Sequence, residues 1–343
     1  MRLAHLAPPW IPVPPVTYGG TELVVDLLVR GLRRRQCEVL VFCSGDSRLA
    51  PPPRPVPFPA LFWPPEKFSE NLHISFAWQY LQRQPVDLLH SHLESAAGFW
   101  QALTPPWPLV ITLHTPITEI KREYLLQFPE VALVAVSEFQ RQRLAGHPQV
   151  HLIHHGLEVE AYRCQTVKDD YLLFLGRIYP EKGLHTAIRL AQASGHRLIC
   201  AGPVFAPDRP YFEIEIAPHL DGRQIIYVGP ADFSRKQDLL GRAKALLLPL
   251  EVDEAFGLVM LEAMACGTPV IAPPRGAVPE VLVPGRTGFL AHSWEEFLAA
   301  LTMVGELDPR VCRQHVVENF SWESMVDKYV ALYRALLDNV RFS

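Results

Sequence analysis

Two acids, Glu254 and Glu262, stand eight positions apart at the ends of an otherwise apolar or glycine stretch. The residues around Glu262 are apolar on every side, which is typical of a buried helix. A carboxylate in such a helix needs a pairing group or a polar ligand, because burial without hydrogen bonds costs free energy. We expect the helix to run from near Phe256 to Gly267, with Glu254 in the preceding loop. Either both acids accept ligand hydroxyls, or Glu254 caps the helix and Glu262 pairs with a buried arginine.

The start of this helix offers a second kind of binding group. The backbone N–H groups of Ala255, Phe256, Gly257 and Leu258 have no partners within a helix and can bind an anion, and Gly257 keeps the approach clear of a side chain. A phosphate on these amides and hydroxyls on the two acids would satisfy the whole stretch. The pattern therefore predicts a ligand that carries phosphate together with sugar or ribose hydroxyls.

Two cations, Arg177 and Lys182, follow an apolar run in the stretch FLGRIYPEKG, 174–183. They stand between a predicted strand and a predicted helix at 184–194. At such a strand end they can clasp a diphosphate, the arginine through its planar fork and the lysine as a point charge. Exposed, solvated side chains are the alternative. The combination with the two acids favours the diphosphate site.

A loop and a histidine complete the candidates. Gly19 and Gly20 lead into a helix that Thr21 can cap, and adjacent glycines allow close approach of a ligand, although a plain tight turn is the alternative. His114 ends the run LVITLH, and this position, rather than the residue type, favours a role for it. The other histidines that end apolar runs are His90, His92, His154 and His155. No histidine or cysteine spacing predicts a metal site.

Short apolar runs alternate with helical patterns, which predicts βα units and parallel sheets covered on both faces. In the first half the predicted strands are 2–7, 38–43, 86–91, 109–114, 131–136 and 150–155. In the second half they are 171–176, 196–202, 224–229, 245–250 and 269–273. Because these strands are many for one sheet, we predict an α/β fold of two Rossmann-like domains that face each other across a cleft. The polar interval 158–170 is the natural joint. After Val283 the strand pattern fades, and 320–337 reads as an amphipathic helix.

The composition fits a soluble globular protein, because 49% of the 343 residues are hydrophobic and 20% are charged. A net charge of −4 gives no reason to expect a nucleic-acid partner. Six cysteines without a CxxC pair favour free thiols and a cytoplasmic protein. Neither the N-terminus nor any apolar run has the length expected of a signal peptide or a membrane-spanning helix.

Two further segments have open interpretations. The proline-rich segment 51–65 is expected to be an extended surface connection, with a proline-rich recognition motif as the alternative. The run RGLRRR, 30–35, either is a solvated helix end favourable to the helix dipole or contacts anionic lipid at the inner face of a membrane.

These residues together resemble the retaining glycosyltransferases of the family 4 type, also called glycosyltransferase group 1, which have the GT-B fold. The matching elements are Gly19-Gly20, LHTP (113–116), SEFQR (137–141), GRIYPEKG (176–183), EAFGLVMLEAMACGTPVIA (254–272) and GAVPEVLVPGRTGFL (276–290). One departure is IHHGLE, where relatives often have Asn-Gly in place of His155-Gly156. No role is therefore carried over to His155.

The resemblance implies a role for each candidate in the second half of the chain. The acid that matches Glu254 holds hydroxyls of the donor sugar, and the acid that matches Glu262 holds the ribose of the nucleotide. The residues that match Arg177 and Lys182 neutralise the diphosphate leaving group. The amides at 255–258 would hold phosphate.

The resemblance also implies the division of labour between domains. Residues 1–160 would form an acceptor-binding domain on which a helix at 321–343 packs, and 161–320 would bind the donor. His114 would lie by the donor sugar, and Gly19-Gly20 by the phosphates and the acceptor. Without a DxD motif, the expected reaction is metal-independent transfer of a hexosyl group with retention, and no tightly bound cofactor is expected. UDP-sugars are favoured over GDP-sugars, and the acceptor is a carbohydrate, a lipid or a small molecule.

Other functions fit the same architecture. The alternatives are a sugar-nucleotide epimerase and a phosphorylase-like enzyme. Release of a nucleoside diphosphate in the presence of an acceptor would distinguish a transferase from both. A sensor that binds a nucleotide sugar without turnover belongs to another class, and the four charged candidates argue against it.

Overall fold

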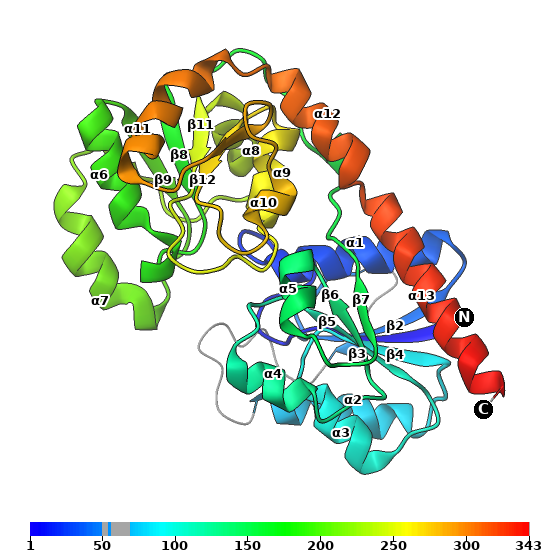
Figure 1. The fold of residues 1–343 in the computed structure, drawn as a ribbon. Coiled ribbons are helices and arrows are strands. Elements are labelled where there is room, and N and C mark those ends of the chain that lie inside the picture. The colour runs from blue at the N-terminus through cyan, green and yellow to red at the C-terminus, as the bar shows by residue number, and fades with distance from the viewer. Residues whose placement is uncertain (50–53, 56–68, 343) are drawn as a thin grey trace. The chain divides into compact units, whose positions relative to one another are not determined.

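The computed structural model describes residues 1–49, 54–55 and 69–342, and the chain divides into two compact units. The first unit comprises 1–15, 19–156 and 322–343, and the second comprises 16–18 and 157–321. Figure 1 shows the helices and strands of each unit. Most of the proline-rich segment 51–65 lies outside the described residues.

The first unit contains a seven-stranded sheet with the order β3-β2-β1-β4-β5-β6-β7. Its strands are β1 (Arg2–Leu6), β2 (Glu38–Cys43), β3 (Arg54–Pro55), β4 (Leu88–Ser91), β5 (Leu109–Leu113), β6 (Ala132–Ala135) and β7 (Val150–Leu152). Its helices are α1 (Gly20–Arg34), α2 (Ser69–Leu81), α3 (Ala96–Leu103), α4 (Glu119–Leu125), α5 (Glu138–Arg143) and α13 (Trp322–Phe342). Neighbouring strands pair in parallel, so their carboxyl ends share one edge of the sheet.

The second unit contains a six-stranded parallel sheet with the order β10-β9-β8-β11-β12-β13. Its strands are β8 (Tyr171–Leu175), β9 (Arg197–Ala201), β10 (Ile225–Tyr227), β11 (Ala245–Leu247), β12 (Val270–Ala272) and β13 (Gly288–Leu290). Its helices are α6 (Leu184–Ser194), α7 (Arg209–Tyr211), α8 (Phe233–Arg242), α9 (Leu258–Ala265), α10 (Val278–Val281), α11 (Trp294–Met303) and α12 (Pro309–Asn319). Helix α6 packs against α11, while α9 packs against α8 and α12.

Each sheet supplies a core of its own. In the first unit, Leu6, Leu89, Ile111 and Leu133 come from four successive strands of the sheet and are fully buried in one cluster. In the second unit the corresponding cluster includes Phe174, Cys200, Leu247 and Ile271, again from neighbouring strands. Burial on both faces explains why these strands read as continuous apolar runs. The predicted α/β class with two parallel sheets is confirmed.

Some predicted boundaries were wrong. The structure has strand β13 after Val283, where we expected no strand, and it has the short strand β3 beside β2. Both strands are only two or three residues long and lie at a sheet edge, so they leave little periodic signal in the sequence. The end helix begins at Trp322 rather than at 320 and runs to Phe342.

The arginine run at the end of α1 holds helix α13. The guanidinium groups of Arg30 and Arg34 lie 5.2 and 4.6 Å from the ring centre of Trp322, and Arg35 forms an ion pair of 2.6 Å with Asp327. These contacts are favourable cation–π and charge interactions between two helices. The arginines of the run 30–35 therefore have partners within their own unit. Neither the lipid-contact interpretation nor the solvated-end interpretation included these partners.

Candidate functional site

Lys182 and Glu254 meet at the carboxyl edge of the second sheet. Lys182 ends a short 3-10 turn, Pro180–Lys182, between β8 and α6. The next residue, Gly183, has φ 73°, and a Cβ there would collide with the carbonyl oxygen of Pro249. The turn is further bound to the segment after β11, because the amide of Glu251 donates to the Glu181 carbonyl at 2.9 Å. This close packing brings the Lys182 ammonium into an ion pair with the Glu254 carboxylate.

The environment keeps Lys182 charged. Its side chain is 22% exposed and that of Glu254 is 18% exposed, so water screens the pair only partly. Burial opposes the charge of Lys182, but the charge and hydrogen bond of Glu254, with smaller contributions from Tyr179 and Tyr18, together outweigh it, and the pKa of the lysine lies above its ordinary value. The interpretation of Lys182 as a solvated surface charge was therefore wrong.

Arg177 lies in a pocket of aromatic rings. Its guanidinium group forms an ion pair of 2.8 Å with Asp208 and lies 4.7 and 5.2 Å from the ring centres of Tyr179 and Phe205. Its side chain is 19% exposed. These partners orient the guanidinium fork, which is the group that suits a phosphate. The interpretation of Arg177 as an exposed charge was also wrong.

Helix α9 begins at Leu258, two residues later than expected. Gly257 is its N-cap with φ 85°, and no side chain of a described residue caps the helix start. Glu254 therefore does not act as the cap. Its backbone is instead held from the other side, because the amide of Ala277 donates to the Glu254 carbonyl at 2.9 Å and Gly276 bridges to Glu254. The amides of Gly257 and Leu258 at the start of α9 thus lie shortly after Glu254 in the chain, and a helix start of this kind can bind an anion.

Glu262 is buried in α9 and has two partners. Its Oε1 accepts a hydrogen bond of 2.9 Å from the hydroxyl of Tyr162. The same oxygen forms an ion pair with Lys236 of α8. Burial, followed by the Glu262 charge, raises the pKa of Tyr162 and keeps its hydroxyl protonated. The pairing cation is a lysine rather than the arginine of the alternative interpretation. Within the described residues, Oε2 of Glu262 has no recorded partner.

The sequence patterns did not indicate three residues of this site: Tyr162, Asp208 and Lys236. Lys236 stands in FSRKQDLLGR, where several charges share a short helix, and nothing in the spacing distinguishes it. Tyr162 stands in the polar joint, and Asp208 in a loop after β9. Their roles depend on tertiary contacts, so the only available signal was the need of a buried carboxylate for a partner.

The glycine loop lies in the first unit. Helix α1 begins at Gly20 with Gly19 as its N-cap, so Thr21 is not the cap. Gly19 has φ 152°, and a Cβ there would come within 2.9 Å of Oε2 of Glu22 and 2.8 Å of Pro15. Burial raises the pKa of Glu22 to about 8. Only glycine fits this close approach, which is more specific than a plain tight turn.

His114 follows β5 and is held on two sides. The side-chain amide of Gln140 donates to the carbonyls of Leu113 and Thr115 at 3.0 and 2.9 Å, which fixes the backbone around His114. The imidazole Nε2 lies 2.8 Å from Nδ1 of His92. Burial, together with the smaller effect of the positive charge of Lys121, lowers the pKa of His114 to about 3. The ring is therefore neutral.

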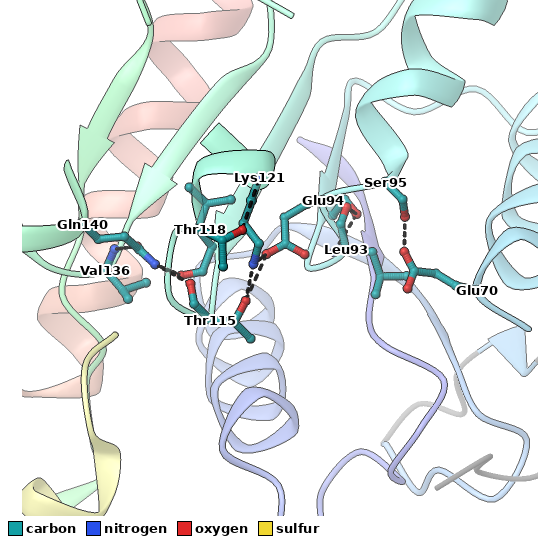
Figure 2. A network of polar contacts seen from close by, with 11 residues as sticks. Glu70, Leu93, Glu94, Ser95, Thr115, Thr118, Lys121, Val136 and Gln140 are labelled. Carbon is teal, nitrogen blue, oxygen red and sulfur yellow. Dashed lines mark hydrogen bonds and ion pairs between the residues drawn. The ribbon is translucent and has the colours of Figure 1, made fainter. Parts of the chain in front are cut away.

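A polar network surrounds this loop. Figure 2 shows Lys121 between Glu94 and Thr115, and Ser95 bonded to Glu70. The Lys121–Glu94 pair is 2.8 Å long, and its side chains are 20% and 25% exposed. The segments after β4 and β5 thus carry hydroxyl, carboxylate and ammonium groups at the carboxyl edge of the first sheet. Such groups can hydrogen-bond a polyhydroxylated ligand.

The predicted residues fall into two groups. Lys182, Glu254 and the start of α9 come together in the second unit, where Arg177 and Glu262 have pairing partners of their own. Gly19, Gly20 and His114 belong to the first unit. Within the described part of the chain, no helix is long and apolar enough to cross a membrane.

Comparison with solved structures defines the class of protein. The chain resembles sucrose-phosphate synthase from Thermosynechococcus elongatus with a TM-score of 0.84 at 20% identity, over 99% of this chain and 100% of that one. It resembles Anabaena HepE in complex with UDP-glucose with a TM-score of 0.78 at 17% identity, over 98% and 100% of the two chains. The fold is therefore GT-B, the two-domain fold of glycosyltransferases.

Comparison of sequences defines the family. A model described as Glycosyltransferase Family 4 matches residues 18–161, and one described as Glycosyl transferases group 1 matches 164–310. The chain belongs to this family of retaining glycosyltransferases, which transfer a sugar from a nucleotide sugar. It is 28% identical to α-maltose-1-phosphate synthase of Mycobacterium tuberculosis over 97% of this chain and 99% of that one. It is 25% identical to D-inositol 3-phosphate glycosyltransferase of Mycobacterium bovis over 92% and 78%. This membership favours transfer over the epimerase, phosphorylase-like and sensor alternatives.

Proposed function

We propose that the chain transfers a hexosyl group from a UDP-sugar to an acceptor hydroxyl, with retention and without a metal ion. The observation that carries this proposal is the ion pair of Lys182 with Glu254 beside the uncapped start of α9. The arrangement places a cation, a hydroxyl acceptor and the backbone amides at the start of α9 within one short stretch of the sheet edge. These are the three kinds of group that a nucleotide-sugar donor needs.

The chemistry follows from where charge develops. Cleavage of the glycosyl–phosphate bond leaves negative charge on the diphosphate, and preorganised donors there lower the barrier. Lys182, Arg177 and the amides at 255–258 supply those donors, so the two cations take the part of a metal ion. The leaving phosphate helps to remove the proton of the acceptor hydroxyl, which attacks the same face of the sugar that the phosphate leaves.

The two acids and the first unit would hold the rest of the substrates. We assign Glu254 to hydroxyls of the transferred sugar and Glu262, through Oε2, to the ribose. His114 would lie by the donor sugar, and the loop at Gly19-Gly20 would lie by the phosphates and the acceptor. In this proposal, residues 161–320 bind the donor and residues 1–160 bind the acceptor.

The choice of UDP and of the acceptor class has support from similar proteins. The structure of HepE holds UDP-glucose, and α-maltose-1-phosphate synthase is named for a phosphorylated sugar product. The network of Glu94, Thr115 and Lys121 adds hydroxyl-binding groups to the carboxyl edge of the first sheet (Figure 2). A carbohydrate acceptor therefore ranks before a lipid or another small molecule.

The first test concerns the donor. A thermal-shift screen of UDP- and GDP-sugars should show the largest rise in melting temperature with a UDP-hexose, because a ligand of the folded state stabilises it. Release of UDP should then depend on an added acceptor and persist in EDTA. Stabilisation by GDP-sugars alone, or loss of turnover in EDTA, would overturn the corresponding part of the proposal.

The second test concerns Lys182. We expect Lys182→Ala to lower kcat by about 100-fold or more, because it removes one preorganised donor from the leaving group. The matched control is Lys244→Ala, which removes a partly buried lysine paired with Asp170 at 3.2 Å in the same unit. Initial rates of UDP release measure both variants. Equal activity of Lys182→Ala and Lys244→Ala would show that the proposed donor site is wrongly assigned.

A further inference from the structure

Histidine rings gather beneath the carboxyl edge of the first sheet. His5 is in β1, His90 is in β4, and His92 and His114 follow β4 and β5. The ring centres of His92 and His114 are 5.1 Å apart, and His114 stacks on His155 at 5.1 Å with an interplanar angle of 17°. All but His114 are buried. So many buried imidazoles require an account of where each ring nitrogen is bonded.

Three of the rings form a hydrogen-bonded chain. Nδ1 of His5 lies 3.4 Å from Nε2 of His92, and Nδ1 of His92 lies 2.8 Å from Nε2 of His114. The chain starts at the buried strand β1 and ends at the half-buried His114. Nδ1 of His114 is therefore the one nitrogen of that ring left for a ligand, since the described residues record no partner for it.

The three rings carry one proton each. Burial lowers the pKa of His5 to about 3 and holds the pKa of His92 well below its ordinary value, as it does for His114. With one N–H on each ring, the two hydrogen bonds must run in the same direction along the chain. Either every ring donates toward His114, or every ring donates toward His5.

The inner end of the chain decides the direction. Nε2 of His5 is fully buried and has no hydrogen-bond partner in the described part of the chain. If the rings donated toward His5, this nitrogen would carry an orphaned N–H, whereas the opposite direction leaves only an unused lone pair there. Buried N–H groups without a partner are the rarer and more costly case. The hydrogen bonds therefore run from His5 to His92 to His114.

We propose that His92, supported by His5, holds His114 as the tautomer with its proton on Nδ1, so that His114 is a hydrogen-bond donor to the donor substrate. His92 is then a positioning residue, and Gln140 fixes the backbone of the same histidine. The inference rests on the proposed function, which places His114 by the donor sugar. A donor N–H suits an oxygen of the sugar and excludes His114 as the base for the acceptor.

A metal ion is the competing occupant of this cluster. The ring nitrogens of His5, His90 and His92 lie within 4.8 Å of one another. Both nitrogens of His90 are already bonded, however, to the Tyr333 hydroxyl at 2.6 Å and the Thr112 hydroxyl at 2.7 Å. His92 likewise uses both of its nitrogens. A metal would have to break these bonds, so the hydrogen-bonded chain accounts for the cluster better.

The tautomer of His114 can be measured without turnover. Long-range ¹H–¹⁵N spectra of the histidine-labelled full chain, with His114 assigned by the loss of its signals in His114→Gln, should show Nδ1 protonated and Nε2 bare. Protonation of Nε2, or one equivalent of metal in the purified protein, would overturn the inference. Because this readout needs no activity, it separates the tautomer from the role of His114: full transfer by His114→Gln would refute the role alone.

A variant series tests the role of His92. His92→Leu removes both nitrogens and should lower kcat/KM about tenfold, as loss of one hydrogen bond does. His92→Asn keeps an amide near the position of Nδ1 and should recover most of this loss. The control is His147→Asn, which changes a buried histidine of the same unit that is bonded to the Phe128 carbonyl. Equal losses in the Leu and Asn variants, with both folded by melting temperature, would overturn the positioning role.

Discussion

At the scale of single residues, each acid of the donor site has its own lysine. Glu254 is paired with Lys182 and Glu262 with Lys236, and both carboxylates are largely buried. Each acid therefore has a cationic partner at contact distance without a ligand. A diphosphate would compete with Glu254 for Lys182, whereas a ribose needs only the unused oxygen of Glu262. The two acids should therefore differ in the kinetic effect of their loss.

Glu262→Gln should weaken donor binding more than it slows catalysis. The amide keeps the shape and can still accept from Tyr162, but it loses the charge that makes the hydrogen bond to a ribose hydroxyl strong. Since a ribose contact is the same in the ground and transition states, we expect KM for the donor to rise about tenfold with kcat nearly unchanged. Initial rates against donor concentration measure this split. Glu318→Gln, on the exposed face of α12, is the control, and a fall in kcat at constant KM would contradict the assignment.

At the scale of elements, the start of α9 determines where Glu254 lies. Gly257 has φ 85°, and an added Cβ would lie 2.5 Å from Cε of Met260 and 3.2 Å from Cγ of Glu254. The segment 276–277 holds Glu254 from its other side. A side chain at position 257 would thus strain the backbone and also press on the acid.

Gly257→Ala should therefore cost both stability and activity. The left-handed backbone alone costs about 1–2 kcal/mol for a non-glycine residue. Gly195→Ala is the matched control, because Gly195 has φ 71° with nothing within 4 Å of its added Cβ. In urea titrations, Gly257→Ala should lose as much unfolding free energy as Gly195→Ala or more. Only Gly257→Ala should also lose transfer activity. Normal transfer by Gly257→Ala would show that Glu254 is not positioned by this turn.

The elements differ in how well the sequence predicted them. The strands near 171–175 and 109–113 are continuous buried runs, and the helix 184–194 has glycines at both ends, so their patterns were complete. Strand β13 has three residues and lies at the sheet edge beside β12, so tertiary context decides it. The site behaved in the same way. Spacing indicated Glu254, Lys182 and the helix start, but the partners of Glu262 come from a different helix and from the joint, which no local pattern joins.

Helices α1 and α13 offer a test of close packing. Gly31 of α1 is buried against Val326 of α13, and a Cβ there would overlap the valine side chain. We expect Gly31→Ala to lower the unfolding free energy of the first unit by about 1–3 kcal/mol through overpacking. The cost should shrink in a Val326→Ala background, which makes room for the added methyl group. Urea titrations of the four proteins of this double-mutant cycle measure the coupling, and a cost that is the same in both backgrounds would contradict the contact.

At the scale of the whole chain, the last helix returns to the first unit and completes its polar core. The hydroxyl of Tyr333 bonds to His90 at 2.6 Å, and that of Tyr329 bonds to Thr112 at 2.8 Å. Both tyrosines are fully buried. The first unit therefore depends on residues from both ends of the sequence, and its core contains neutral histidines that would be charged in an unfolded chain at mildly acidic pH.

These buried neutral histidines predict that the free energy of unfolding of the first unit decreases as the pH falls below about 6.5. Burial lowers the pKa of His5 and His114 to about 3 and of His73 to about 4, and it lowers those of His90, His92 and His155 as well. Below the ordinary histidine pKa the unfolded chain binds protons that the folded chain excludes, so each ring removes about 1.4 kcal/mol per pH unit. Glu22, with its pKa raised to about 8, acts in the opposite direction, because its folded form keeps a proton that the unfolded chain releases above about pH 4.5. Glu70, whose pKa burial also raises, acts in the same direction as Glu22, and these two carboxyl groups cannot offset six histidines between pH 5 and 6.5.

Urea titrations between pH 5 and 7.5, followed by tryptophan fluorescence, measure this slope. The signal reports mainly on the first unit, because Trp294 is the only tryptophan among the described residues of the second unit. His73 supplies the control, since its Nε2 bonds to the Ala7 carbonyl at 2.8 Å and a glutamine amide can replace that bond. His73→Gln should reduce the slope of unfolding free energy against pH by the contribution of one proton, about 1.4 kcal/mol per pH unit, while the rest of the pH dependence remains. A stability that is flat between pH 5 and 6.5 would mean that these imidazoles are hydrated or already charged in the folded chain, which would also remove the neutral rings on which the chain from His5 to His114 depends.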